Sequence, residues 1–141
     1  MAPRVRYEDV AEGEELKPWS YQVAREDLVR YAGASGDQNP IHQDEQFARS
    51  VGLPDVIAHG MHTMGKIGQY VTDWCADPGA LRRFKTRFTA MVVVPKDGGG
   101  SVTVSGKVAE KLEGNRIRVD VKAMNAEGVV AASAEVIVEL A

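Results

Sequence analysis

Hydrophobic and polar residues alternate along most of the second half of the chain. Segments 83–88, 101–108, 116–122 and 129–140 each place their apolar residues at every second position. Such alternation predicts antiparallel strands that are covered on one side only. The tetrapeptides LEGN at 112–115 and NAEG at 125–128 are typical of hairpin turns. We therefore predict four antiparallel strands between about Leu81 and Leu140, and segment 19–24 is a further candidate strand.

Helical spacing replaces the alternation in the first half. Residues 25–33 favour a helix that ends at Gly33, and Asp44 is a suitable N-cap for a short helix that ends at Gly52. The strongest helix pattern lies in 59–74, where apolar residues recur at steps of three and four: Met61, Met64, Ile67, Val71 and Trp74. A long apolar helix must bury its face against the one-sided sheet. This predicts an α+β fold in which an antiparallel sheet wraps around one central helix.

Length and composition narrow the class of protein. With 141 residues the chain is predicted to be a single domain, 1–141. The formal net charge of -3 argues against nucleic acid as the main partner. The single cysteine, Cys75, excludes an intrachain disulfide and is expected to be a packing residue. Neither a signal peptide nor a membrane span is evident, so a cytoplasmic setting is expected.

The segment SGDQNPIHQD, residues 35–44, concentrates turn-forming and ionisable side chains beside the apolar helix pattern. Asn39 and Pro40 predict a turn, because proline restricts its own φ and the residue before it. The turn can bring Asp37 towards His42, so that the carboxylate holds the imidazole in one tautomer or both hold a water. A structural interpretation stays open, with Asp37 as a turn or capping residue and His42 as an ordinary histidine.

Three glycines interrupt the strongest helix pattern, and each costs about 1 kcal/mol relative to alanine in a helix interior. Tight packing against a neighbouring element is the expected reason for Gly65 and Gly68. Gly60 differs because it lies in the first turn, where backbone N–H groups have no partner within the helix and carry the positive end of the dipole. A carbonyl oxygen that gains negative charge would be stabilised there.

Two stretches, YAGASGDQNPIHQD and GLPDVIAHGMHTMG, resemble the hydratase 2 motif of the MaoC-like, (R)-specific enoyl-thioester hydratases and dehydratases. The likeness covers nearly the whole chain, and IAHGM, VTDW and DPGA are most similar to actinobacterial members, including the beta subunit of a mycobacterial (3R)-hydroxyacyl-carrier-protein dehydratase. The resemblance implies a hot-dog fold. It also implies the following site: catalytic Asp37 and His42, an oxyanion-binding Gly60 N–H, a supporting loop of Ser35, Asn39 and Pro40, and substrate contacts from His59 and Met61.

The implied reaction is the reversible hydration of trans-2-enoyl thioesters of CoA or an acyl carrier protein to (3R)-hydroxyacyl thioesters, without a cofactor. Because sheet edges invite pairing, a homodimer or a heterodimer with a related subunit is expected. One departure stands out: some relatives carry a supporting serine on the central helix, at the position of Gly68 here. Support for Asp37 must then come from Asn39, Ser35 or a partner chain.

Several alternatives stay open from the sequence. One alternative is a chain that works only with a partner subunit, and another is a hot-dog thioesterase. A metal site is a further rival, built from His59 and His62 with His42 and Asp44, although no metal is predicted. The strand face of Arg83, Lys85 and Arg87 is expected to be solvated, the alternative being contact with CoA phosphates or an acidic carrier protein.

Overall fold

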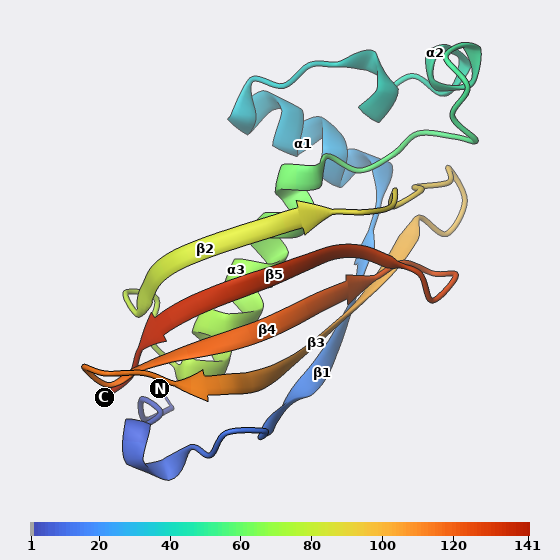
Figure 1. Cartoon of the computed structure of the whole chain (residues 1–141). Helices are drawn as coiled ribbons and strands as arrows, with labels where there is room; N and C mark the ends of the chain where they lie inside the picture. The colour runs from blue at the N-terminus through green and yellow to red at the C-terminus, as the bar shows by residue number, and fades with distance from the viewer. Residues whose placement is uncertain (1) are drawn as a thin grey trace.

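A computed structural model describes residues 2–141 and contains one five-stranded antiparallel sheet with a long helix packed against it (Figure 1). The strands are β1 (Glu15–Val23), β2 (Leu81–Phe88), β3 (Gly100–Lys111), β4 (Arg116–Met124) and β5 (Val130–Glu139). Their order across the sheet is β1-β3-β4-β5-β2, and every neighbouring pair is antiparallel. The four predicted strands and the candidate first strand are thus confirmed, and β1 and β2 form the two edges.

The helices are α1 (Arg25–Ser35), α2 (Glu45–Ser50) and α3 (Gly60–Cys75), with short 3-10 turns η1 (Tyr7–Asp9) and η2 (Pro40–His42). Asp44 caps α2 as predicted, because its Oδ1 accepts a hydrogen bond from Phe47 N at 3.1 Å. The prediction that Gly33 ends α1 is wrong. The helix continues to Ser35 and stops at Gly36, whose φ of 80° suits glycine and whose N–H is bonded to Ala32 O.

The core lies between α3 and the inner face of the sheet. The alternating valines of β3, β4 and β5 are buried there together with Ile67 and Val71 of α3. The buried stripe of α3 consists of Thr63, Ile67, Tyr70, Val71 and Cys75. Met61 was predicted to belong to this stripe, but it is 57% exposed. The first turn of α3 therefore stands at the margin of the core, and Cys75 packs inside it as expected.

Residues 36–59 extend beyond the sheet at the N-terminal end of α3, with α1 and α2 at the same end (Figure 1). Arg25, at the start of α1, anchors this extension. Its guanidinium donates to Asp55 Oδ1 at 2.6 Å, to Glu45 Oε2 at 3.3 Å and to Val94 O at 3.0 Å. Residues 56–58, which lead into α3, are held by backbone hydrogen bonds to Val92 and Val94, and Ile57 forms an isolated β-bridge with Val93. This anchoring fixes where the Asp37–His42 loop meets α3.

None of the helices within residues 2–141 combines the length and the apolar character that crossing a bilayer requires.

Candidate active site

The loop after α1 turns sharply so that its ionisable side chains converge. Asn39 makes the turn predicted from the sequence: its Oδ1 accepts a hydrogen bond from Ile41 N at 3.2 Å and so starts η2, with Pro40 at the first position. His42 ends η2, and its ring lies 4.0 Å from Asp37, measured from Nε2 to Oδ2. Two residues five positions apart are therefore brought face to face by the turn between them.

The tautomer of His42 follows from its hydrogen bond. Its side chain is only 8% exposed, and Nδ1 lies 2.7 Å from the carbonyl oxygen of Ile57. Because a carbonyl oxygen only accepts hydrogen bonds, Nδ1 carries the proton. The lone pair of the neutral ring is then on Nε2, which is the nitrogen that faces Asp37. His42 is thereby oriented as a base towards the space beside the carboxylate.

Asp37 is held by its own loop and remains open to solvent. Its Oδ1 accepts a hydrogen bond from Asn39 N at 3.2 Å, and its backbone N donates to Ser35 Oγ at 3.2 Å. The side chain is 52% exposed. The 4.0 Å between Oδ2 and His42 Nε2 exceeds a direct hydrogen bond, so both atoms can share a water or a substrate hydroxyl. Ser35 and Asn39 thus both contact Asp37 within the loop.

His59 lies beneath the pair. It is 2% exposed, and its ring stacks on that of His42 with centroids 3.7 Å apart and an interplanar angle of 22°. Its Nε2 is 3.2 Å from the carbonyl oxygen of Asp37, so Nε2 carries the proton and donates it. Burial is the main cause that lowers the pKa of His59; the His42 ring also lowers it, and the backbone hydrogen bond and charge of Asp37 oppose the shift. The neutral form is therefore favoured near pH 7.

Tyr31 of α1 packs against the same group. Its ring meets His59 edge-on at 4.7 Å between centroids and meets His62 at 5.4 Å. His62 is half-buried, and its pKa is lowered by burial first and then by the charge of Lys66, against an opposing effect of Asp27. His62 thus joins the group through its contact with Tyr31.

Gly60 is the first residue of α3 and is exposed beside this group. Its N–H belongs to the first turn, where no partner exists within the helix. The Phe88 ring at the end of β2 lies so close that an added Cβ would be 3.2–3.3 Å from it. The absence of a side chain at Gly60 thus leaves room for the Phe88 ring beside the first turn of α3. A developing oxyanion placed there would meet an N–H donor and the positive end of the helix.

The same cluster offers nitrogen and oxygen atoms within 4.8 Å of one another from Asp37, His42 and His59. A metal would need the lone pair of each ligand. The Nε2 of His59 carries a proton that it donates to Asp37 O, and its Nδ1 is buried. Asp44 is used as the cap of α2. Two donors remain, Asp37 and His42, which is fewer than the three or four protein ligands of zinc sites.

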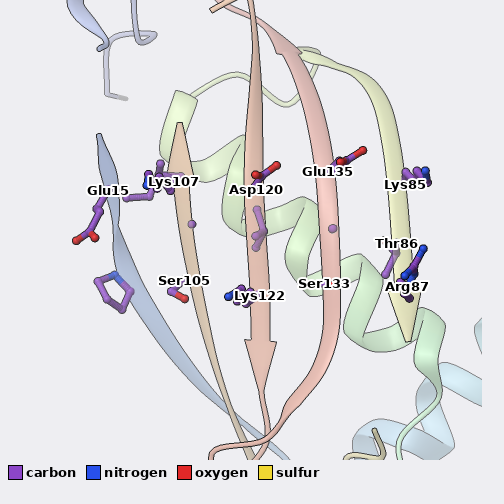
Figure 2. A pocket seen from close by; sticks show the side chains of 15 residues that line it. Glu15, Lys85, Thr86, Arg87, Ser105, Lys107, Asp120, Lys122, Ser133 and Glu135 are labelled. Atoms are coloured by element: carbon purple, nitrogen blue, oxygen red, sulfur yellow. The ribbon is translucent and has the colours of Figure 1, made fainter. Parts of the chain in front are cut away.

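A large hollow lies away from the Asp37–His42 pair. It measures about 810 Å³ and lies on the face of the sheet that points away from α3 (Figure 2). Exposed charged side chains from all five strands line it, among them Lys85, Arg87, Lys107 and Lys122. Lys85 and Arg87 are thus exposed on the outer face, as predicted. None of the catalytic candidates contributes to this hollow.

The structure places the sequence candidates Asp37 and His42 next to each other, with Gly60 following His59 at the start of α3, but the sequence did not reveal what holds them. The carbonyl of Ile57 and the ring of Tyr31 carry no recognisable signal, because each contacts residues that are distant in the sequence. His59 was expected to touch substrate, whereas the structure buries it against His42. Met61, the other expected substrate contact, is exposed next to Gly60.

Comparison with known proteins identifies the family to which most of the chain is similar. Residues 9–127 match the family described as MaoC like domain. The chain is 32% identical over 106 residues to an (R)-specific enoyl-CoA hydratase of Rhodospirillum rubrum, covering 74% of this chain and 73% of that protein. It is 34% identical over 122 residues to a 3-hydroxybutyryl-CoA dehydratase of Methylorubrum extorquens, covering 82% of this chain and 73% of that protein.

Solved structures agree with the fold. A MaoC-like dehydratase superposes with a TM-score of 0.94 and 37% identity over 98% of this chain, which spans 43% of that longer chain. The ChsH1-ChsH2 complex of Mycobacterium tuberculosis matches with a TM-score of 0.82 over 93% of this chain and 98% of the matched one; at 24% identity this likeness concerns the fold alone. The family match over residues 9–127 and the identity to the Rhodospirillum rubrum hydratase show that the chain belongs to the MaoC-like domain family, and its sheet packed on α3 is the hot-dog fold.

Proposed function

We propose that this protein is a hydro-lyase that interconverts trans-2-enoyl and (3R)-hydroxyacyl thioesters of CoA or an acyl carrier protein. The observation that carries the proposal is the orientation of His42. The Ile57 carbonyl accepts a hydrogen bond from Nδ1–H, so the Nε2 lone pair faces Asp37, beside the exposed start of α3. The relatives named hydratase and dehydratase support the same reaction class.

In the dehydration direction His42 and Asp37 divide the work. Nε2 of His42 takes the proton from C2, and the electrons move towards the thioester oxygen. The N–H of Gly60 stabilises the negative charge that develops on that oxygen. Asp37 holds the departing 3-hydroxyl by a hydrogen bond, and the proton that His42 took from C2 passes to that hydroxyl, which leaves as water as the C2–C3 double bond forms. His42 and Asp37 thereby return to their starting protonation states, and hydration runs through the same steps in reverse.

The reaction needs no redox partner. The thioester carbonyl already acidifies the C2 proton, so deprotonation requires only a base and an oxyanion donor. His42 and Gly60 supply these two groups. We therefore propose that the protein works without a cofactor or a metal.

The site is open in the single chain, and this supports a dimer. β2 is an edge strand, and exposed apolar side chains gather near its end and near Gly60: Met61, Phe88 and Met91. A second hot-dog subunit paired along this edge would cover them and enclose an acyl chain. The partner is either a second copy of this chain or a related subunit, and the latter case would give an active enzyme only as a heterodimer.

The first test uses the purified chain with trans-2-butenoyl-CoA. Loss of the enoyl-thioester absorbance is expected, together with formation of the (3R)-hydroxy product. His42→Ala and Asp37→Asn are each expected to lower kcat at least about a hundredfold, since a positioned acid or base contributes 10²–10⁴. Undiminished rates in both variants would refute the proposed site.

The same assay separates the alternatives. Release of free CoA thiol without a hydroxyacyl product would identify a thioesterase. A chain that is inactive alone but active after co-expression with a second hot-dog subunit would identify a heterodimer. Light scattering of the active species then gives its subunit number.

A further inference from the structure

His59 contacts both members of the catalytic pair and is covalently joined to the third functional group. Its ring stacks on His42 at 3.7 Å, and its Nε2–H donates to the carbonyl oxygen of Asp37 at 3.2 Å. The next residue in the chain is Gly60, and His59 is the N-cap residue of α3. No other described residue makes contacts of both kinds. Its position therefore couples the loop that carries Asp37 to the helix terminus that carries Gly60.

The buried environment favours one state of the His59 ring. Nε2 is used as a donor, and Nδ1 is buried without a hydrogen-bond partner among the described residues. A second proton on Nδ1 would be buried unpaired, next to the parallel ring of His42. A neutral His59 thus stays under His42 while His42 gains and loses its own proton.

Tyr31 holds His59 in place from the side of α1. Its ring packs edge-on against His59 at 4.7 Å. Asp37 and His42 of the loop and Tyr31 of α1 all meet at this one side chain. The geometry requires both a flat ring, for the stack, and an N–H, for the bond to Asp37.

We propose that His59 is the positioning residue of the hydro-lyase site, setting the distance and angle between Asp37 and His42 without touching substrate. This inference rests on the proposed function and deepens it. It replaces the substrate contact that the sequence suggested for His59. A displacement of about 1 Å in such a site can reduce the rate about a hundredfold.

Two complementary variants test the two contacts separately. His59→Phe keeps the flat ring and removes the N–H, and His59→Gln keeps an N–H donor and removes the ring. Each is expected to lower kcat about ten- to a hundredfold and to change KM less than about threefold, because substrate binding is left intact. The matched control is His62→Gln. His62 lies one turn further on α3 and packs on the same Tyr31, but it contacts neither Asp37 nor His42, so its kcat is expected to stay within about twofold.

A spectroscopic measurement keeps the inference independent of activity. Nitrogen-15 NMR of the wild-type protein at pH 7.5 is expected to show the Nδ1–H tautomer for His42 and the Nε2–H tautomer for His59. The ring protons of His42 are expected to move downfield in His59→Gln, which removes the ring current of the stack, and to keep their position in His62→Gln.

The outcomes are distinct. Wild-type kcat in both His59 variants would overturn the inference, and so would an Nδ1–H tautomer for His59 or an unmoved His42 resonance in His59→Gln. A rise in KM with unchanged kcat would return His59 to a substrate contact. If the wild-type chain shows no hydration of any enoyl thioester, the proposed function fails, and the tautomers and the His42 shift still decide whether His59 positions the pair.

Discussion

Two glycines three residues apart on α3 provide a controlled test of how closely the helix and the sheet pack. An ideal Cβ added at Gly68 would lie 2.9 Å from Cε2 of Phe84, whereas a Cβ added at Gly65 would meet nothing within 4 Å. Phe84 belongs to edge strand β2 and is packed against the core. Its ring occupies the space that a side chain at position 68 would need. The packing role predicted for both glycines is therefore right for Gly68 and wrong for Gly65.

The same substitution should consequently have opposite effects at the two positions. Gly65→Ala is expected to raise the free energy of unfolding by about 1 kcal/mol, the difference in helix propensity. Gly68→Ala gains the same propensity but forces the Phe84 ring to shift, and overpacking of this kind costs about 1–3 kcal/mol. The two variants should thus differ by about 1–3 kcal/mol. For a domain of this size that is roughly 3–9 °C in Tm.

Urea denaturation followed by circular dichroism measures this difference directly. Gly68→Ala together with Phe84→Leu supplies the internal control, because the smaller side chain is expected to restore part of the loss. Equal stabilisation by alanine at both positions would refute the close approach of Phe84. Gly68→Ser is not expected to restore the stability lost in Gly68→Ala. Gly68 also lies eight residues, or about 12 Å along the helix axis, from Gly60 at the proposed active site.

Three further predictions concern charge and burial. The pKa values of His59 and His62 are lowered from 6.5, so below that pH the unfolded chain binds more protons than the folded one. The free energy of unfolding is therefore expected to fall as the pH is lowered from about 6.5 to the folded pKa values, by at most about 1.4 kcal/mol per pH unit for each histidine. A urea midpoint that is the same at pH 7.5 and 5.5 would contradict this. Asp55→Asn removes the carboxylate that lies 2.6 Å from Arg25 in a mostly buried ion pair, and it is expected to lower the free energy of unfolding by about 1–3 kcal/mol. Urea denaturation measures this, and an unchanged midpoint would show that the ion pair does not stabilise the fold. Cys75 is buried and burial raises the pKa of its thiol, so Ellman's reagent is expected to react only as the chain unfolds, and rapid reaction of the native protein would argue against this packing.

Local patterns were sufficient for most of the fold. Alternation of apolar residues predicted β3, β4 and β5, which each bury residues at alternate positions against α3, and it also predicted β2, an edge strand in which only Phe84 and Thr86 are partly buried. The end of α1 was misplaced by three residues, since Gly33 and Gly36 look alike in sequence and only Gly36 adopts a positive φ. The predicted burial of Met61 was also wrong, because helical spacing shows which side of the helix is apolar but not how far along the helix the sheet extends.

The local sequence was enough to single out the candidate residues of the site. Asp37 and His42 are close in the chain, and the turn between them is encoded by Asn39 and Pro40, so their meeting is a local matter. Gly60 was equally predictable as the start of a strong helix.

The orientation of these groups depends on contacts between segments that are distant in the chain. The Ile57 carbonyl sets the tautomer of His42, and the ring of His59 lies beneath it; both lie fifteen or more residues further along the chain. Their contacts depend on the return of the chain past residues 92–94 and on the anchoring of the extension by Arg25. Hydrogen bonds and stacks between distant segments leave no periodic trace in a sequence. The positions of reactive atoms therefore follow from the fold, while the identity of those atoms follows from the chain.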